Sequence, residues 1–257
     1  SLSYANAHRP WELYQDLFYK TLEKVRMVAP TKKFSFQNKL LSLDASIIEL
    51  SLAIFPWADF NRTKGAVKLH LLLDHDGYLP QYALITEGKV HEINVARKLN
   101  LPAHSIIAID RGYIDYELFS NWTDQKVWFV TKFKSNTRYN VRYKTPIDTL
   151  PENILADELI QFSGKTSRQK CNHTLRRVVV RHPETDEEIE LLTNNLKFEP
   201  QTIAAIYKDR WQIEMFFKAL KQNMKIKTFI GTNMNAIQIQ ICTALIAMLL
   251  VKYLQFL

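Results

Sequence analysis

The chain has 257 residues, 34 basic and 26 acidic side chains, a formal net charge of +8 and 47% hydrophobic residues. That length and apolar fraction suit one large globular domain, or a domain with an inserted piece, and exclude a disordered chain. Six Gly, nine Pro and two Cys exclude collagen-like material, a disulfide framework and a zinc site of paired cysteines. The small number of cysteines favours a reducing, cytoplasmic compartment.

The ends of the chain give two expectations. Residues 1–20 contain no basic start followed by an apolar run, so a signal peptide is not predicted. The chain begins with Ser1 rather than Met and ends on Phe256-Leu257, so we expect a piece of a longer protein.

The first half of the sequence alternates between helical and strand patterns. A helix is expected at 10–28, and a short strand at 40–44 runs into a mixed apolar segment that reaches residue 54. Two strands at 66–73 and 79–86 flank Asp74-His75-Asp76-Gly77, which is typical of a hairpin turn. A short helix at 90–99, a buried strand at 105–109, a helix at 114–122 and a strand at 126–133 follow.

The pattern changes after residue 133. Residues 134–193 contain strand-like runs at 176–180 and 189–192 among turns and charges, which predicts a β-rich insertion. We therefore divide the chain into a first core part at 1–133, the insertion at 134–193 and a second core part at 194–257. This last part holds an amphipathic helix at 200–223 and a very apolar helix at 236–257. The apolar run from Ile241 to Val251 is too short for a membrane span, so we expect a core helix.

The whole net charge lies in residues 126–181, which hold twelve basic and four acidic residues, while the rest of the chain is neutral. A local basic field in a neutral body indicates a polyanionic partner, although a chance bias of a soluble surface would give the same count. The basic residues are Lys126, Lys132, Lys134, Arg138, Arg142, Lys144, Lys165, Arg168, Lys170, Arg176, Arg177 and Arg181.

Three carboxylates occupy positions that suit metal chemistry. Asp44 and Asp110 each close an apolar strand, where a side chain of an α/β sheet points into the ligand-binding crevice. An aspartate at a strand end is also a common turn starter. Glu214 lies on the 200–223 helix.

That helix carries four polar side chains on one edge of its apolar face. Tyr207, Arg210, Glu214 and Lys221 fall within a stripe of roughly 60° on a continuous helix. The alternative is that Arg210–Glu214 and Glu214–Lys218 are ordinary surface pairs four residues apart.

The spacing Tyr207-x2-Arg210-x3-Glu214-x6-Lys221 resembles the signature of bacterial insertion-sequence transposases of the DDE type, in the group numbered four. Asp44-Ala45-Ser46, with Lys64-Gly65-x2-Lys68-x-His70 after it, is similar to that group's first catalytic region. Asp110-Arg111-Gly112-Tyr113 is similar to the second, and the resemblance covers about residues 11–257. It does not extend to the tryptophan that some relatives carry before the Leu191-Leu192-Thr193 strand, because Ile189-Glu190 stands there.

The resemblance implies a ribonuclease-H-like fold, a mixed sheet flanked by helices, with the β-rich insertion before the last catalytic helix. Asp44, Asp110 and Glu214 would be the catalytic residues and would bind two Mg²⁺ ions, with Mn²⁺ able to substitute. The implied partners are double-stranded DNA at transposon ends and targets and a second copy of the chain, with no membrane partner. The DNA-binding residues expected from the resemblance and the basic excess are Tyr207, Arg210, Lys221, Lys64, Lys68, His70, Lys132, Arg176 and Arg177.

Other interpretations stay open at this point. The chain would then be a DNA-binding remnant without catalysis, or a Mg²⁺-dependent nuclease of the same fold that does not join DNA. His70-x4-His75 with Asp74 and Asp76 has the residue types of a metal cluster, but a polar hairpin tip explains it more simply.

Overall fold

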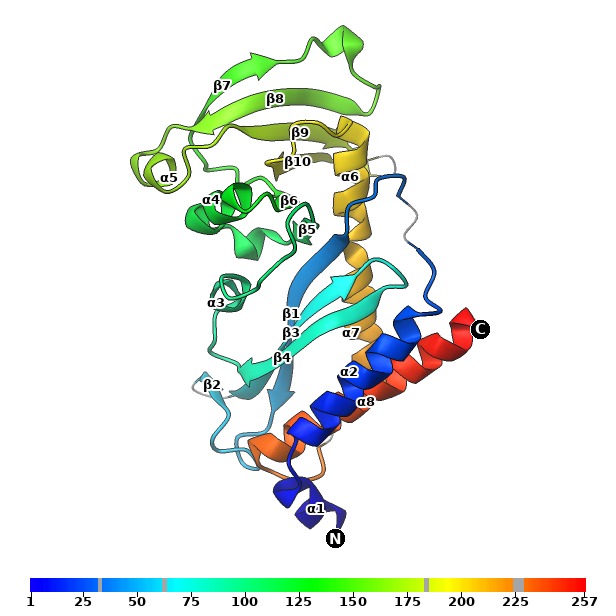
Figure 1. The fold of residues 1–257 in the computed structure, drawn as a ribbon. Helices are drawn as coiled ribbons and strands as arrows, with labels where there is room; N and C mark the ends of the chain where they lie inside the picture. Colours follow the sequence, from blue (N-terminus) through cyan, green and yellow to red (C-terminus); the bar gives the residue numbers. More distant parts are fainter. Residues whose placement is uncertain (32–33, 62–63, 183–184, 224–228) are drawn as a thin grey trace. The chain divides into compact units, whose positions relative to one another are not determined.

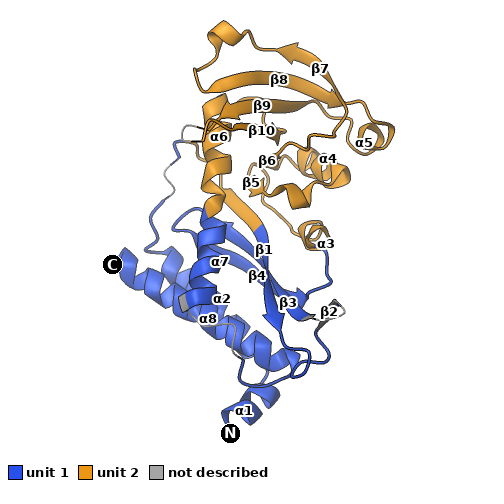
Figure 2. Ribbon diagram, turned by 180° about the vertical axis from the view of Figure 1, so that it is seen from behind, with its two compact units in different colours: residues 1–35, 44–91, 212–257 blue, residues 36–43, 92–211 orange. Residues whose placement is uncertain are grey.

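The computed structural model describes residues 1–31, 34–61, 64–182, 185–223 and 229–257. Helices and strands alternate along the chain, which confirms the predicted α/β class (Figure 1). Packing divides the chain into two compact units (Figure 2). Unit 1 holds residues 1–35, 44–91 and 212–257, and unit 2 holds residues 36–43 and 92–211. The segments 1–133, 134–193 and 194–257 follow sequence pattern rather than packing, and their boundaries stay a prediction.

Unit 1 buries a core between helices and a hairpin. Its helices are α1 (Leu2–His8), α2 (Glu12–Arg26), most of α7 (Trp211–Asn223) and α8 (Met234–Phe256), and its strands are β2 (Asp59–Asn61), β3 (Lys64–Asp74), β4 (Leu79–Glu87) and the greater part of β1 (Leu40–Leu50). Apolar residues of α2, β3, α7 and α8 form one buried cluster, with Leu22, Leu69, Leu220 and Ile241 at most 1% exposed. The core-helix prediction for 236–257 is supported by this packing, although α8 is by length and composition apolar enough to cross a membrane.

The β3–β4 hairpin confirms the turn predicted from Asp74-His75-Asp76-Gly77. The antiparallel register runs to Asp74 opposite Leu79. The Asp74 carboxylate accepts the backbone N–H of Asp76 at 3.1 Å, and Gly77 and Tyr78 take φ angles of 68° and 51°. Because Asp74 shapes the turn and His75 is buried against the Tyr78 ring, the hairpin-tip interpretation accounts for these polar residues.

Unit 2 is built on a mixed sheet. The first residues of β1 pair in parallel with β5 (Ile106–Ile109), and β5 pairs in parallel with β6 (Trp128–Lys132). The insertion strands then continue the sheet by antiparallel pairing in the order β10 (Glu188–Thr193), β9 (Leu175–Arg181), β8 (Ile154–Phe162) and β7 (Tyr139–Lys144). The order β4-β3-β1-β5-β6 followed by a β-rich insertion confirms the predicted ribonuclease-H-like sheet.

Helices of unit 2 flank this sheet. They are α3 (Glu92–Ala96), α4 (Tyr116–Asp124), α5 (Lys165–Lys170) and α6 (Pro200–Asp209), with 3₁₀ turns at Arg111–Tyr113 and Ile147–Thr149. Helix α4 begins at an aspartate cap, since the Asp115 carboxylate accepts the Leu118 N–H at 2.8 Å. Helix α6 packs on β5, β6, β8, β9 and β10, so the insertion strands help to hold it.

The helix expected over 200–223 is wrong in one respect, because it is divided at Arg210 into α6 and α7. Arg210 keeps right-handed helical angles, with φ −51° and ψ −31°. Its N–H is shared between the carbonyls of Ile206 at 3.2 Å and Tyr207 at 3.3 Å. Such shared bonds tighten the last turn of a helix, which explains an interruption that hydrophobic periodicity does not reveal.

Candidate active site and nucleic-acid surface

Asp44 and Glu214 line one pocket in unit 1. The pocket has a volume of ≈ 470 Å³, and its other lining residues are Ala45, Ser46, Phe217, Lys218, Lys221 and Gln222. Both carboxylate side chains are half-buried, and Asp44 also accepts the N–H of Ala45 at 2.8 Å. Two of the three predicted catalytic residues are therefore found together, with two lysines beside them.

Helix α7 turns Glu214 into this pocket because its other face is buried. Ile213, Phe216, Phe217 and Leu220 belong to the core of unit 1. Glu214, Lys218 and Lys221 are spaced by four and three residues, which places them on one adjacent face of the helix. The Lys221 ammonium donates to the carbonyl of Ile47 at 2.8 Å, and this bond ties α7 to β1.

Asp110 lies in a separate pocket of unit 2. This pocket has a volume of ≈ 790 Å³ and is lined by Asp110, Arg111, Gly112, Ile114, Lys132, Lys134, Ser135 and Asn136. Asp110 is exposed and follows β5 directly, as the sequence predicted. Lys132, predicted to bind DNA, is exposed in the same pocket, so one carboxylate faces a strongly cationic lining.

The sheet register relates the two predicted aspartates to neighbouring strands. Strands β1 and β5 run parallel, and their register ends with Leu43 opposite Ile109. The next residue of the chain is Asp44 in one case and Asp110 in the other. Each aspartate thus follows a buried residue that is paired with the residue before the other.

Tyr207 and Arg210 contact each other in unit 2. The guanidinium carbon of Arg210 lies 5.4 Å from the centre of the Tyr207 ring, and Arg210 is 8% exposed. Tyr207 is half-buried near the end of α6. A cation held over an aromatic face loses little freedom when it binds a further anion, so the pair has the features of a pre-oriented phosphate contact.

The predicted contacts near β3 are placed differently. The side chain of Lys64 lies outside the described residues. Lys68 is 5% exposed and its ammonium donates to the carbonyl of Val90 at 2.8 Å. His70 is fully buried with Nε2 3.0 Å from the Thr86 hydroxyl. His70 is fully buried, and Lys68 is buried with its ammonium already bound to a backbone carbonyl, so we do not carry them into the proposed DNA surface.

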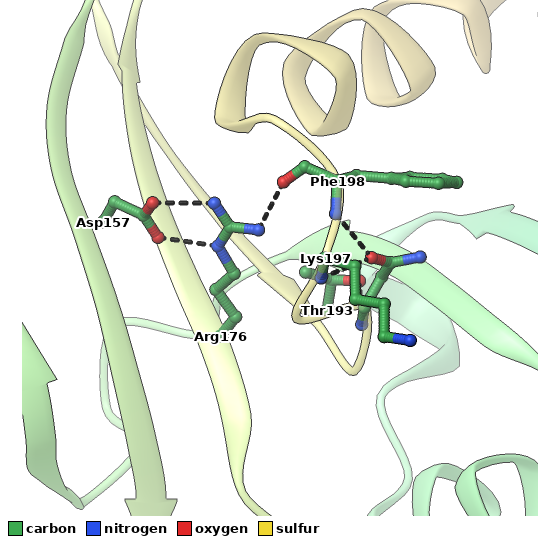
Figure 3. A network of polar contacts seen from close by, with 6 residues as sticks. Asp157, Arg176, Thr193, Lys197 and Phe198 are labelled. Carbon is green, nitrogen blue, oxygen red and sulfur yellow. Dashed lines mark hydrogen bonds and ion pairs between the residues drawn. The ribbon is translucent and has the colours of Figure 1, made fainter. Parts of the chain in front are cut away.

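Arg176 and Arg177 are adjacent on β9 and therefore point to opposite faces of the insertion sheet. Arg176 forms two bonds of 2.7 Å to the Asp157 carboxylate and a third, of 2.5 Å, to the carbonyl of Phe198 (Figure 3). Arg177 binds Glu158 at 2.8 Å and Glu190 at 2.9 Å. These guanidinium groups have partners inside the sheet, so neither is part of the DNA surface proposed below.

The connector between β10 and α6 is held by the same network. Phe198 and Lys197 donate their backbone N–H groups to the Asn195 side chain at 2.9 and 3.0 Å. The backbone N–H of Asn195 in turn donates to the Thr193 hydroxyl at 3.0 Å. Because Arg176 holds the Phe198 carbonyl, the insertion sheet fixes the start of the helix that carries Tyr207 and Arg210.

Several lining residues are not among the site residues predicted from the sequence. Lys218, Ser46 and Gln222 join Asp44 and Glu214, while Arg111, Lys134 and Asn136 join Asp110. The signal for Lys218 was its position four residues after Glu214, and the signal for Lys134 was its place in the basic segment. Neither signal separates a site residue from a solvated surface residue without the fold.

The donor set fits a hard divalent cation. The candidate ligands are carboxylate oxygens, which Mg²⁺ prefers, and Mg²⁺ commonly takes one or two protein carboxylates and fills its other positions with water and substrate phosphate. Within the described ranges no group of three or more His, Cys, Asp or Glu is arranged to hold a metal ion. The pair Asp44 and Glu214 therefore fits a metal that is completed by water and phosphate.

Comparison with known proteins gives a consistent family. The model of the transposase DDE domain matches residues 36–250. A putative transposase, y4zB, of Sinorhizobium fredii is 30% identical over 254 residues, which cover 98% of this chain and 70% of that protein. The probable transposase for insertion sequence element IS5377 of Geobacillus stearothermophilus is 27% identical, covering 87% of this chain and 58% of that protein.

Two further matches are a curated relative and a solved structure. A putative transposase for insertion sequence element IS4SA of a Synechocystis species is 27% identical, with 84% of this chain and 60% of that protein covered. A cryo-EM structure of the piggyBac transposase synaptic complex with hairpin DNA has a TM-score of 0.48 and 13% identity, covering 84% of this chain and 48% of that one. The chain spans 58% to 70% of the length of the curated relatives named here.

Proposed function

We propose that the chain cleaves and joins DNA strands and that Asp44, Asp110 and Glu214 are its catalytic residues, because the chain belongs to the DDE-domain transposases of bacterial insertion sequences. The family is one of enzymes that act on DNA. The observation that carries the residue assignment is the pocket shared by Asp44 and Glu214, since the two lie far apart in sequence.

Asp110 enters the proposal through the parallel register of β1 and β5. Neighbouring parallel strands bring their carboxyl ends to the same edge of a sheet. In that register Leu43 lies opposite Ile109, and Asp44 and Asp110 are the residues that follow them in the chain. The mixed charge around Asp110 suits a carboxylate that works beside a polyanion.

We propose that Asp44 and Glu214, which share a pocket, and Asp110, which the family implies, hold Mg²⁺, with Mn²⁺ as a substitute. When bound, such ions activate the attacking oxygen and stabilise the leaving oxygen of a phosphodiester. The chain's own contribution is to present carboxylate oxygens from a strand and a helix that are fixed by their packing. Phe217 and Leu220 anchor α7 in the core, so Glu214 keeps its place without rearrangement.

The cations around the carboxylates hold DNA phosphates in this proposal. Lys218 and Lys221 belong to the Asp44 pocket, and Arg111, Lys132 and Lys134 belong to the Asp110 pocket. Contacts to phosphates place the duplex but do not read its sequence. Tyr207 and Arg210 are proposed as a further phosphate contact, in which the planar guanidinium binds two oxygens.

The finer parts of the proposal have the family as their only support. They are strand transfer at transposon ends, action as a homodimer on DNA, and a location in the bacterial cytoplasm. Mass measurement of the chain with and without an element-end duplex tests the homodimer. A measured mass of a single chain, both alone and in the complex with DNA, would contradict it.

The test of the catalytic assignment is cleavage of a labelled duplex that carries the ends of the element. The wild-type chain should nick it only when Mg²⁺ or Mn²⁺ is present. Asp44→Asn and Glu214→Gln should lower nicking at least about 100-fold, with duplex affinity kept. Asp148→Asn, at an exposed carboxylate of the insertion, is the matched control and should cleave like the wild type.

The outcomes separate the competing functions. Nicking that persists in Asp44→Asn or Glu214→Gln would reject the proposed site. DNA binding without nicking in any metal would indicate a DNA-binding remnant. Nicking without joining of a pre-cut 3′-hydroxyl end to target DNA would indicate a nuclease of the same fold. Titration of Mn²⁺ into each variant by calorimetry reports on metal binding independently of cleavage.

A further inference from the structure

We propose that a second pocket, beside α5 in the insertion, binds a DNA backbone phosphate at a place separate from the Asp110 pocket. The inference rests on the proposed function, since it assumes a DNA substrate, and it adds a contact that the catalytic residues do not require. The pocket has a volume of ≈ 560 Å³ and is lined by Ser163, Lys165, Arg168, Gln169 and Asn172.

The lining has the chemistry of a phosphate site. Lys165 and Arg168 are cationic, the other three lining residues are neutral hydrogen-bonding groups, and none of these five is acidic. A guanidinium binds two phosphate oxygens at once, an ammonium adds a point charge, and amide or hydroxyl groups satisfy the remaining oxygens. A carboxylate ligand would need only part of this set, whereas a tetrahedral phosphate uses all of it.

The two cations are available for a ligand. Both side chains are exposed, and neither forms an ion pair with another residue of the described ranges. Lys170, on the same helix, is different because its ammonium lies 3.9 Å from the Glu117 carboxylate. Helix α5 thus uses one cation to hold α4 and leaves two facing its pocket.

The pocket is also held in shape from the inside. Ser167 is buried and its hydroxyl donates to the Gly164 carbonyl at 3.1 Å. Cys171, which is 1% exposed, donates its backbone N–H to the Ser167 carbonyl at 2.9 Å. A Cβ at Gly164 would lie 2.9 Å from the Ser167 hydroxyl, so a larger residue there would displace this hydroxyl from its present position. A phosphate would therefore meet a lining whose backbone is already ordered.

A line of cations connects this pocket to the one that contains Asp110. Lys132 and Lys134 line the Asp110 pocket at the end of β6. Arg138 follows just before β7, is exposed, and accepts the N–H of Ser163 at its carbonyl at 2.9 Å. Ser163 lines the α5 pocket. Exposed cations thus lie along the chain between the Asp110 pocket and the α5 pocket, where they can contact successive phosphates of one DNA backbone. This favours DNA over a small free anion as the occupant.

The first test compares two double variants that remove the same charge from the same insertion. Lys165→Gln with Arg168→Gln empties the pocket of cations, while Lys144→Gln with Arg181→Gln removes exposed cations that already pair with Glu158 and Asp186. Affinity for an element-end duplex is measured between about 50 and 200 mM salt. The pocket variant should flatten the slope of log K against log salt by about one unit, since each phosphate contact contributes about 0.9. The control should change the slope much less.

The second test locates the contact on the DNA. Single phosphates of the duplex are replaced one at a time by uncharged methylphosphonates, and wild type and pocket variant are compared on each. Replacement of one particular phosphate, distant from the nicked bond, should remove the difference in affinity between wild type and pocket variant. Arg168→Lys, which keeps the charge and loses the two-oxygen geometry, should recover part of the lost affinity. The melting midpoints of the variants should match that of the wild type, which confirms folding.

The failures of the two proposals can be told apart. Unchanged slope in the pocket variant, or an equal change in the control variant, would overturn the α5 site while the wild type still binds and nicks DNA. A critical methylphosphonate at the nicked bond would overturn its separateness from the catalytic pocket. A wild-type chain that binds no duplex would reject the proposed function itself, and the α5 site with it.

Discussion

Two pairs of cations in the insertion, Lys165 with Arg168 and Arg176 with Arg177, are close in sequence but have opposite environments. Arg176 and Arg177 lie in β9 and spend their charge on Asp157 and Glu158 inside the sheet. Lys165 and Arg168 lie on α5 and face a pocket without acidic lining. Residue type and neighbourhood in sequence are similar, so what separates structural from ligand-binding cations is the presence of a carboxylate on the paired strand.

This difference sharpens the charge argument. Residues 126–181 hold twelve basic and four acidic residues, and the two buried pairs account for two of each. Ten exposed basic and two exposed acidic residues remain. The excess of the segment is therefore wholly on its surface, where it adds to the field that attracts DNA. The buried pairs neither add to this field nor subtract from it.

The largest expected effect of breaking the comparison is on stability. Arg176→Ala should lower the free energy of unfolding of the chain by about 3–5 kcal/mol, because Asp157 would stay buried without its partner. Urea unfolding followed by circular dichroism measures this loss. Arg181→Ala, at an exposed arginine 3.4 Å from Asp186, is the control and should cost at most about 1 kcal/mol.

The same pair offers a check on its cause. Replacing both partners, by Arg176→Met with Asp157→Leu, should recover most of the stability, since apolar residues of similar size need no desolvation of charge. A loss below about 1 kcal/mol in Arg176→Ala would show that the pair is not buried as described.

Arg177→Ala should have the next largest effect. Arg177 is half-buried, binds Glu158 and Glu190, and lies 5.9 and 5.7 Å from the ring centres of Phe133 and Tyr139. Its loss should cost about 1–3 kcal/mol, because Glu158 is left with little solvent. A double-mutant cycle with Glu158→Gln should show a coupling of about 1 kcal/mol or more. Additive effects would mean that the two side chains do not interact.

Much of the fold follows from sequence pattern, because strands and helices there depend on local periodicity. The β3–β4 hairpin and the end of β5 before Asp110 are both predicted from the sequence. Strands β7 and β8 and helix α5 are not predicted from the sequence. In β7 Val141 and Tyr143 alternate with polar residues but stay exposed, so pairing with β8 rather than burial orders this strand. The break at Arg210 depends on hydrogen-bond geometry that no residue pattern encodes.

The candidate site was predictable to a similar extent. Asp44 and Glu214 were expected together and lie in one pocket, because strand ends and helix faces are readable from spacing. The burial of Lys68 and His70 was not readable, since β3 is covered on both sides and a lysine in such a strand looks like a surface residue. The ion pairs of Arg176 and Arg177 depend on the register of β8 and β9, which places Glu158 directly opposite Arg177.

The exposed pair should show the reverse of Arg176. Lys165→Gln with Arg168→Gln should change the free energy of unfolding by less than about 0.5 kcal/mol, because neither side chain is buried or paired within the described residues. Urea unfolding of this variant beside Arg176→Ala gives the comparison directly. A destabilisation of more than about 2 kcal/mol would mean that α5 needs these cations to fold, and that their effect on DNA is indirect.

The smallest expected effect concerns Lys170, the one α5 cation that is paired with a carboxylate. Its partner Glu117 is exposed and 3.9 Å away, so Lys170→Ala should change the opening of α5 by no more than about fivefold. Cys171 reports this opening, since burial raises the pKa of its thiol, Asp124 adds to that rise, and only the thiolate reacts. Labelling of native protein, followed by peptide mass spectrometry, separates it from Cys242, whose pKa burial raises to about 11. Both thiols should react faster as pH rises through 7 to 9, because a raised pKa leaves the thiolate a minor form there. Cys242 belongs to unit 1, so its labelling rate should not respond to Lys170→Ala. A much larger gain in the labelling rate of Cys171 would show that Lys170, a paired surface cation, and not the buried Ser167 and Cys171, holds α5 in place.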